Sequence, residues 1–582
     1  MYDNGRMLLD RLKQLIPILQ WLPNYQRVWL ADDLIAGTVV LFITVPQVIA
    51  YAFLAGLPPQ AGLYAAILSL LCYSMFGSSR ALAVGPTAII AMMTLEAVSD
   101  LATPGTTEYM LVATRLALLT GCILLVLRVV NFGAVISFLS HAVVSGFITA
   151  AATLIMFNQI PTLLGIPSSN GTDLMSVANH LGHEVTNTNL LSLGLGLSSV
   201  ALLLFCRAPL TRLLRAKGIA EVWVGALTRS APMYAVALSV AYVFFSGQDQ
   251  ALPIVGHIPA GVPEFHSFSF SGAELEQLLP SALLIAMVVF MESTSIGTAV
   301  AVKQRAKIIP NQELVGLGFA NLGSALVGGF PVAGSFARTI VNYSAGAATQ
   351  LAGIITALLV LCALMGFGWF FYYLPKSILA AIIVLSAWQL IDWQGIRKTF
   401  SFSAADAVTF VFTFLAVLLL GVEPGILVGI GISFVLLIRS SSKPHIAVVG
   451  RWQGTEHFRN VMRHEVETLP NVLAVRIDES FYFVNSRYIE TYLLNEVTES
   501  PELEHVLLIC TATNFIDSSG LEMLELLSDS LDQLGVTLHL AEVKGPVMDK
   551  LKETEFFEHM QGKVFFTTDI AMLTLAKFPS TH

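Results

Sequence analysis

The sequence predicts an α-helical membrane protein with fourteen membrane-spanning segments, arranged as a seven-plus-seven inverted repeat and followed by a soluble α/β domain. Three observations predict this class. Of the 582 residues, 55% are hydrophobic and only 12% are charged, whereas about a quarter of the residues of a soluble globular protein are charged. The charge is also uneven, because 32 of the 71 charged residues lie in residues 443–582. Finally, short segments that open with Gly and Pro occupy the third place in each set of seven, which is typical of inverted repeats in membranes.

The chain divides into three parts by composition. We expect an N-terminal segment over residues 1–32, a membrane domain over 33–442 and a soluble domain over 443–582. The first 442 residues hold 20 basic and 19 acidic residues, whereas the last 140 hold 11 and 21. This acidic excess excludes a basic surface for nucleic acid, so the expected partner is the lipid bilayer of a cell membrane, inner or plasma.

The spanning segments are apolar over about 20 residues, the length of a helical crossing, or over a shorter half-crossing. The first set is 33–53, 61–77, 86–97, 111–130, 133–153, 188–206 and 219–245. The second set is 278–300, 313–328, 334–346, 351–371, 375–391, 404–420 and 424–440.

Basic residues in the short loops predict the orientation, because cytoplasmic loops carry an excess of Lys and Arg. Residues 98–110, 154–187 and 246–277 contain neither Lys nor Arg. The loops that alternate with these hold Arg80, Arg128, Arg207, Arg212, Arg215, Lys217, Lys303, Arg305, Lys307, Arg397, Lys398, Arg439 and Lys443. This alternation predicts that the N-terminus and the C-terminal domain are both cytoplasmic.

The third and tenth segments, VGPTAIIAMMTLEAV and PVAGSFARTIVNYSAG, are short. In the predicted topology one runs outward and the other inward, so both helices begin near the middle of the membrane. Each helix N-terminus offers free N–H groups and about half a positive charge, and two such ends facing one gap make an anion site. The donors we expect are Thr87, Ser335 and the backbone around Gly85, Ala88, Gly334 and Phe336. The alternative is a pair of kinked helices without a ligand.

Two of the charged residues inside apolar segments are candidates for a role in transport. A charge at mid-bilayer depth costs about 2.5–3.5 kcal/mol and normally faces a cavity, so we expect Arg338 to place a fixed positive charge behind the anion. The alternative is an arginine that reaches the membrane surface. Glu292 has the neighbouring oxygen donors Ser293, Thr294 and Ser295, and we expect it to carry a proton or to bind Na⁺. The alternative is a structural carboxylate paired with Arg338.

Gln47 and Tyr51 lie four residues apart in the first segment, directly after Pro46. An amide and an aromatic ring on one face of a kinked helix line a pocket. The spacing fits plain core packing equally well.

The soluble domain alternates between strand and helix patterns. The predicted strands are 472–477, 481–484, 506–510, 536–540 and 564–566, and the predicted helices are 487–500, 521–534, 547–557 and 570–576. This alternation favours a sheet with helices packed on it. Asp517, Ser518 and Ser519 come between a buried strand and a helix, where they cap the helix or, in the alternative, form a phosphorylation switch.

Three stretches make the sequence resemble the sulfate permease family, the prokaryotic relatives of solute carrier family 26. They are PQVIAYAFLAGLPPQAGLYAAILSLLCYSMFGSSRALAVGPTA, NQELVGLGFANLGSALVGGFPVAGSFARTIVN and VLLICTATNFIDSSGLEMLELL. The first two are similar to the family's repeats, and the third resembles the core of its cytoplasmic STAS domain. They occur in the family order and cover nearly the whole chain.

The resemblance implies a core domain that moves against a gate domain in an elevator-like step, within a homodimer. It also implies an anion pocket between the third and tenth helices. Carried over by motif, the pocket residues are Gln47, Tyr51, Thr87, Ala88, Ser335, Phe336, Ala337 and Arg338, with Glu292 beside them.

Two positions depart from the family pattern. Ala337 stands where many members have Ser, which removes one hydroxyl donor. Ile296 stands one turn after Glu292, where sodium-dependent bicarbonate members have Thr. A glutamate without that Thr favours proton coupling.

The function predicted from these features is secondary active transport of a small anion, namely sulfate, bicarbonate or a C4-dicarboxylate, coupled to Na⁺ or H⁺. The alternatives are an anion channel or uncoupled exchanger, and a membrane-tethered signalling protein acting through its STAS domain. No nucleophile–base pair or metal-ligand set supports an enzyme, and no cofactor is expected apart from Na⁺ as a possible coupling ion at Glu292.

Overall fold

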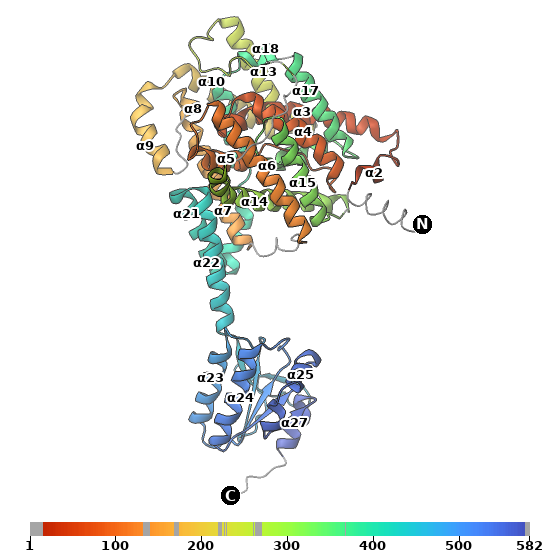
Figure 1. Cartoon of the computed structure of the whole chain (residues 1–582), viewed down its shortest axis with the longest axis vertical. Coiled ribbons are helices and arrows are strands. Elements are labelled where there is room, and N and C mark those ends of the chain that lie inside the picture. The colour runs from red at the N-terminus through yellow and green to blue at the C-terminus, as the bar shows by residue number, and fades with distance from the viewer. Residues whose placement is uncertain are drawn as a thin grey trace. The chain divides into compact units, whose positions relative to one another are not determined.

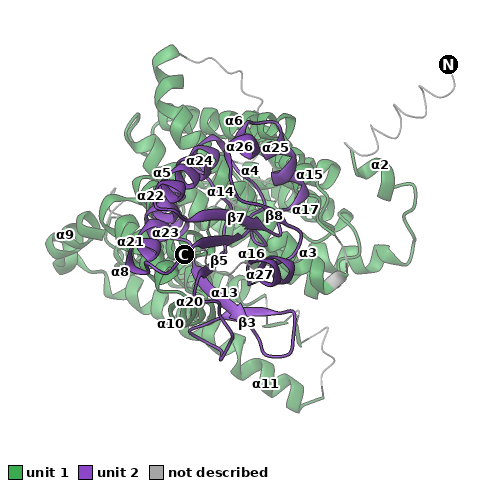
Figure 2. Ribbon diagram, turned by 90° about the horizontal axis from the view of Figure 1, so that it is seen from below, with its two compact units in different colours: residues 1–432 green, residues 433–582 purple. Residues whose placement is uncertain are grey.

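The computed structural model describes residues 16–131, 140–167, 174–218, 224–225, 227–228, 230–259, 261, 271–305, 307–366 and 368–576. Parts of the predicted segments 133–153, 219–245 and 351–371, and both ends of the chain, lie outside these ranges. Two compact units are present, Met1–Ile432 and Ser433–His582, shown in separate colours in Figure 2. Since the division falls inside one helix, the domain boundary at residues 442 and 443 stays a prediction.

Within the described residues, each predicted spanning segment overlaps one main helix, and segment 351–371 also includes a second, short helix (Figure 1). The first set is α3 (Trp29–Leu54), α4 (Pro59–Phe76), α5 (Ala88–Ser99), α6 (Thr107–Val129), α7 (His141–Asn158), α10 (Leu190–Arg207) and α13 (Ala231–Ser246). The second set is α14 (Gly272–Gln304), α15 (Pro310–Leu326), α16 (Phe336–Ser344), α17 (Leu351–Gly366), α19 (Lys376–Trp388), α21 (Ala404–Leu420) and α22 (Val422–Ser442).

Shorter helices lie between or beside the spanning ones. They are α2 (Ile18–Trp21), α8 (Ile160–Leu164), α9 (Leu174–Glu184), α11 (Pro209–Ala216), α18 (Gly368–Tyr372) and α20 (Trp393–Phe402). By length and composition, eight helical stretches of the described chain can cross a membrane, and four shorter helices of 10–17 residues are also apolar. The half-helix α5 is among these shorter ones, as its interrupted sequence predicts.

Reciprocal packing relates the two sets of helices. The fourth helix of the first set, α6, packs on the second helix of the second set, α15. With the sets exchanged, the fourth helix of the second set, α17, packs on the second helix of the first set, α4. In the same way, α17 packs on α3, and its counterpart α6 packs on α14. A third pair of equivalent contacts joins α7 to α21 and α19 to α10. Such exchange symmetry is what two repeats of opposite orientation produce.

A short antiparallel ladder joins the two repeats at their centre. Strand β1 (Val84–Gly85) pairs with β2 (Ala333–Gly334), and each leads into a half-helix, α5 or α16. Gly334 is needed there, because a Cβ would lie 2.9 Å from the Leu82 side chain and 3.1 Å from the Ser293 Cα. The ladder therefore fixes the starts of the two half-helices relative to each other.

The second unit is a six-stranded sheet with helices on both faces. The strands are β3 (Ile446–Arg451), β4 (Phe458–Asn460), β5 (Val472–Ile477), β6 (His505–Ile509), β7 (Thr537–Ala541) and β8 (Val564–Phe565), in the order β4-β3-β5-β6-β7-β8. The strands β5 to β8 are parallel, and β3 is antiparallel to both neighbours. The helices are α23 (Ser486–Glu499), α24 (Ser518–Gln533), α25 (Gly545–Lys552), α26 (Phe556–His559) and α27 (Thr568–Leu575).

The predicted strand over residues 481–484 is wrong. Only Phe481 forms a β-bridge, to Ile516, and the chain then turns into α23. Side chains hold this turn, because Asn485 Oδ1 accepts a hydrogen bond from Tyr482 N and Asp517 Oδ2 accepts one from Phe483 N. An apolar run of four residues does not distinguish a strand from such a connection. The strands β3 and β4 were also absent from the predicted pattern.

Candidate functional site

The two half-helices begin at residues with different capping. Ser335 precedes α16, and its N–H donates to Ala83 O at 3.0 Å across the β1–β2 ladder. Its hydroxyl lies 3.5 Å from Arg338 N, at the outer limit of a hydrogen bond. Thr87 precedes α5 in an extended conformation, and its side chain forms no capping hydrogen bond. The first N–H groups of both helices have no partner inside their own helix, so they are available to a ligand.

A small cavity of about 30 Å³ lies where these helices begin. It is lined by Tyr51, Thr87, Ala88, Ile89, Glu292, Ser335, Phe336, Ala337, Ser386, Gln389 and Leu390. Its walls come from α3, α5, α14, α16 and α19, so residues far apart in the sequence meet there. Most of the residues predicted for the pocket are therefore brought together.

Arg338 lies beside this cavity with almost no exposure to solvent, at 1%. Its Nη2 donates to Pro86 O at 2.6 Å, while its Nε and Nη1 have no hydrogen-bond partner among the described residues. The guanidinium also approaches the first strand closely, since a Cβ on Gly85 would lie 3.0 Å from Nη1. A buried charge with unused donors is costly unless a ligand completes its hydrogen bonds.

Other polar atoms at the same place share this lack of partners. Within the described part of the chain, Thr87 Oγ1, Glu292 Oε2 and Gln47 Oε1 are buried and form no hydrogen bond. Buried polar groups in proteins nearly always have partners. Unsatisfied groups that gather around the starts of two half-helices therefore indicate a binding site for a polar ligand.

Glu292 projects from α14 into the small cavity. No ion pair within 4 Å joins it to Arg338 in the described structure. The geometry therefore differs from the alternative of a carboxylate held permanently by the arginine. Glu292 faces the same space as the two helix ends, where its charge acts directly on a bound ion.

The three hydroxyl residues after Glu292 lie elsewhere. Ser293 Oγ accepts a hydrogen bond from Gly334 N at 2.8 Å, so it supports strand β2. Thr294 Oγ1 donates to Phe290 O in its own helix at 2.6 Å, and Ser295 is exposed. None of these residues lines the small cavity, and among the described residues no group of three His, Cys, Asp or Glu side chains is arranged to hold a metal ion.

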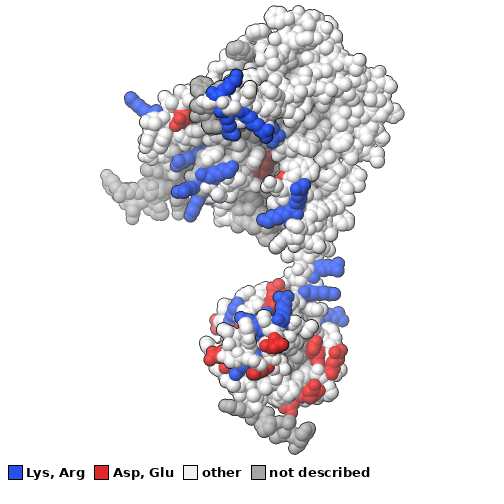
Figure 3. All heavy atoms as spheres, turned by 180° about the vertical axis from the view of Figure 1, so that it is seen from behind, with Lys and Arg blue, Asp and Glu red and all other residues white. Residues whose placement is uncertain are grey.

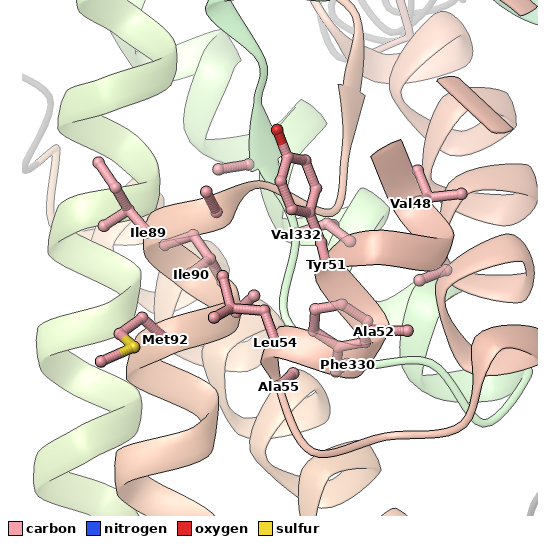
Figure 4. Close-up of a cluster of buried hydrophobic side chains, with 14 of the residues drawn as sticks. Val48, Tyr51, Ala52, Leu54, Ala55, Ile89, Ile90, Met92, Phe330 and Val332 are labelled. Carbon is pink, nitrogen blue, oxygen red and sulfur yellow. The ribbon is translucent and has the colours of Figure 1, made fainter. Parts of the chain in front are cut away.

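Gln47 and Tyr51 lie on the face of α3 that meets α19. Gln47 Nε2 is 3.4 Å from Ser386 Oγ. Figure 4 shows the Tyr51 ring among apolar neighbours such as Ile90 and Phe330, with its hydroxyl directed away from them. The tyrosine thus packs its ring in the apolar core and also lines the small cavity.

Ser386 and Gln389 are two cavity residues that the sequence reasoning missed. Ser386 lies on α19 with Ile382 and Leu385, and Gln389 directly follows that helix. All four line a second, larger cavity of about 590 Å³. Their spacing of three and four residues places them on one helical face. Two polar residues at this spacing in an apolar segment were the sequence feature that could have predicted their place at the cavity.

The larger cavity opens from the small one towards a group of basic residues. Ser386 and Gln389 line both cavities, as do Phe336 and Ala337, and Arg207 and Arg215 line only the larger one. Figure 3 shows Lys and Arg side chains gathered on one part of the first unit, beside a broad area without charge. The shared walls place the arginine-lined cavity directly beside the starts of the half-helices.

In the second unit, Asp517 has a structural role. Its Oδ1 accepts from Gly520 N at 2.8 Å and caps α24, and its Oδ2 accepts from Phe483 N at 3.0 Å. Ser518 is exposed at the first turn of the helix, and Ser519 is half-buried. The capping interpretation has direct support from these contacts, while phosphorylation at this segment stays a prediction. Burial also raises the pKa of the Cys510 thiol to about 12, which disfavours its reactive thiolate form.

Fold and site together define a class of protein. Opposed half-helices at the centre of an inverted repeat, a buried arginine and a cavity that reaches one face are the features of a multi-pass membrane transporter, not of an enzyme. The chain belongs to the sulfate permease family, whose model matches residues 30–413. The model of the STAS domain matches residues 463–571, which confirms the predicted nature of the C-terminal domain.

Known proteins resemble the chain over nearly its whole length. Probable sulfate transporter 4.2 of Arabidopsis thaliana is 32% identical over 571 residues, which are 96% of this chain and 83% of that protein. The fold is similar to that of SLC26A9, with a TM-score of 0.89 and 22% identity over 98% of this chain and 94% of the other. The transmembrane domain of the cyanobacterial bicarbonate transporter BicA matches with a TM-score of 0.59 and 22% identity, over 70% of this chain and 98% of the other.

Proposed function

We propose that this protein is a secondary active transporter that moves sulfate across a cell membrane together with protons. The observation that carries the proposal is the buried Arg338 guanidinium, which has two unbonded nitrogens beside the starts of two opposed half-helices. The relative named as a probable sulfate transporter favours sulfate over bicarbonate and C4-dicarboxylates.

Sulfate fits the donors that meet at the cavity. It is a tetrahedral dianion whose four oxygens all accept hydrogen bonds. The N-termini of α5 and α16 supply N–H groups and positive dipole ends from two directions, Arg338 supplies a full charge, and the Thr87 hydroxyl supplies a neutral donor. Because these donors point from different sides, a tetrahedral ion uses more of them than a planar one.

A proton on Glu292 is the coupling ion that best fits the site. An ionised carboxylate in the same cavity repels a dianion, and protonation removes that repulsion. Proton and sulfate therefore bind more tightly together than apart. A Na⁺ ion needs several oxygen ligands, whereas the hydroxyls of Ser293 and Thr294 are engaged elsewhere.

Transport further requires that the site face each side of the membrane in turn. We place the arginine-lined cavity on the cytoplasmic side, with both termini there, because Lys and Arg mark cytoplasmic loops. The half-helices and the β1–β2 ladder would then move as one body against the gate helices, including α7, α10 and α19, in an elevator-like step within a homodimer.

Uptake into proteoliposomes made with the full chain tests this proposal. Labelled sulfate, bicarbonate and fumarate are supplied separately under an imposed pH gradient without Na⁺, or under a Na⁺ gradient at equal pH. We expect the pH gradient to drive sulfate accumulation. Uptake that never exceeds equilibration would indicate a channel or uncoupled exchanger. Na⁺-dependent bicarbonate uptake would show that the substrate is bicarbonate and the coupling ion is Na⁺, against the proposal. No transport of any anion would favour signalling through the STAS domain.

A further inference from the structure

Residues of the facing helices α3 and α19 contribute to the walls of three cavities. On α3, Gln47 lines the large cavity, Tyr51 lines the small one, and Phe53 lines a third cavity of about 130 Å³. On the antiparallel α19, Ser386 lines the large and the small cavity and Lys376 lines the third. The large and the third cavity therefore lie towards opposite ends of the two helices, and the small cavity shares wall residues with the large one.

The turn between α3 and α4 and the loop between α5 and α6 line the far side of the third cavity. Gly56 and Pro104 contribute to its wall. Gly105 N donates to Gly56 O at 3.2 Å, and Tyr109 Oη donates to Ala55 O at 2.8 Å, so the turn and the loop are bound to each other. Movement of these elements would open this cavity to the opposite side of the membrane.

Lys376 places a positive charge in this cavity without an acidic partner. In the described part of the chain no Asp or Glu forms an ion pair with it, and its Nζ lies 4.9 Å from the centre of the Phe53 ring. It is the first residue of α19, where the helix dipole disfavours a cation. Its backbone is fixed by Pro253 O, which accepts its N–H at 2.9 Å. An ammonium group without an acidic partner beside a cavity is suited to bind an anion that enters it.

Gln159 is a second polar side chain at this cavity that is suited to bind an anion. Gln159 follows α7 and is only 6% exposed. Its side-chain amide forms no hydrogen bond with the described residues, and it lines the third cavity together with Thr162. An ammonium group, an amide N–H₂ and a hydroxyl around one space are donors suited to an oxyanion.

We propose that Lys376 and Gln159 form a second anion-binding site, which receives the anion from the side of the membrane opposite Arg207. This inference rests on the proposed transport function. In the present conformation the Phe53 ring covers the ammonium group through a cation–π contact. Because Phe53 belongs to α3 and Lys376 to α19, movement of α3 past α19 withdraws the ring and exposes the ammonium group to the arriving anion.

Sided uptake measurements test this site. Intact cells present labelled sulfate to one face of the full chain, and inverted vesicles present it to the other. Lys376→Gln should raise the half-saturating sulfate concentration about tenfold from one face and leave it unchanged from the other. Lys376→Arg should restore most of the affinity. Arg207→Gln is the matched control, and its effect should be confined to the opposite face.

Gln159→Leu provides an independent check in case Lys376→Gln lowers the amount of folded protein. It should raise the half-saturating concentration about threefold from the same face as Lys376→Gln. Equal effects from both faces, or none in either variant, would reject the second site while leaving the transport proposal intact. If the unaltered protein takes up sulfate from neither face, the transport proposal itself fails.

Discussion

The half-helices α5 and α16 occupy equivalent places in the two repeats, yet they carry different chemistry. Each follows a two-residue strand of the same ladder and is preceded by a hydroxyl residue, Thr87 or Ser335. Three residues after the hydroxyl, however, α5 has Ile90 and α16 has Arg338. Ile90 is packed in the apolar core, while Arg338 reaches back across the ladder to Pro86 O.

This difference separates two tasks in anion binding. The repeated backbone geometry provides N–H groups and dipole ends from both sides, so it orients the ion. The full positive charge comes from one side only. We therefore expect changes to the charge to affect binding far more than changes to single neutral donors.

The most severe test of this comparison is Arg338→Ala. Because it removes the only full charge among the donors, we expect sulfate binding to weaken by at least about 100-fold, or about 3 kcal/mol. The measurement is equilibrium binding of labelled sulfate to the purified full chain. Arg80→Ala, which removes an exposed arginine of the loop before β1, should change affinity little. Retained affinity in Arg338→Ala would mean that the backbone alone binds the ion.

Glu292→Gln tests the opposing charge. The neutral amide imitates a permanently protonated carboxyl, so sulfate should still bind, within about threefold of the unaltered affinity. Accumulation driven by a pH gradient should disappear, because the variant no longer gains and loses a proton. Uptake with and without the gradient in proteoliposomes measures this loss. Persisting gradient-driven accumulation would assign the proton to another group.

Thr87→Val tests how much a neutral hydroxyl donor contributes to sulfate binding. Valine keeps the shape but lacks the unbonded hydroxyl, so we expect about fivefold weaker sulfate binding, or about 1 kcal/mol, with no loss of stability. Thr94→Val on the same helix is the control, since that hydroxyl already donates to Ile90 O at 2.8 Å. Equal affinities of the two variants would show that the Thr87 hydroxyl does not reach the ion.

The smallest effect is expected from Ala337→Ser. This change adds a hydroxyl to a half-buried residue that lines both cavities at the start of α16. One more donor should tighten sulfate binding by about two- to threefold. A titration of the variant beside the unaltered protein measures the difference, and weaker binding would mean that the added oxygen obstructs the site.

Much of the fold was predictable because apolar length and loop charge are local properties of the sequence. Each of the fourteen predicted segments contains a helix in the described part of the chain, and the two half-helices were recognised from their Gly- and Pro-containing starts. The β1–β2 ladder was not, because two-residue strands have no periodicity and their partners lie about 250 residues apart in the chain. The turn at Phe481 was mistaken for a strand for a related reason, since its hydrogen bonds involve Asp517 in a later segment.

The residues of the candidate site also divide into those that the local sequence reveals and those that depend on contacts between distant segments. Arg338 and Glu292 stood out because charges are rare in apolar segments. Ser386 did not, because a single serine in an apolar helix is ordinary, and its partner Gln47 is 339 residues away. The hydrogen bond from Gly334 N to the Ser293 hydroxyl was also not predictable, because it depends on how α14 packs against strand β2.

The ladder between β1 and β2 also bears on how such a protein can arise. Its two strands come from different repeats, so neither repeat encloses the ion alone. A chain with a single repeat would need a second copy inserted upside down in the same membrane, and its loops could then show no consistent bias of positive charge. Joining both copies in one chain makes their opposed orientation permanent. Each copy is then free to diverge, so the arginine needs to be present in only one of them.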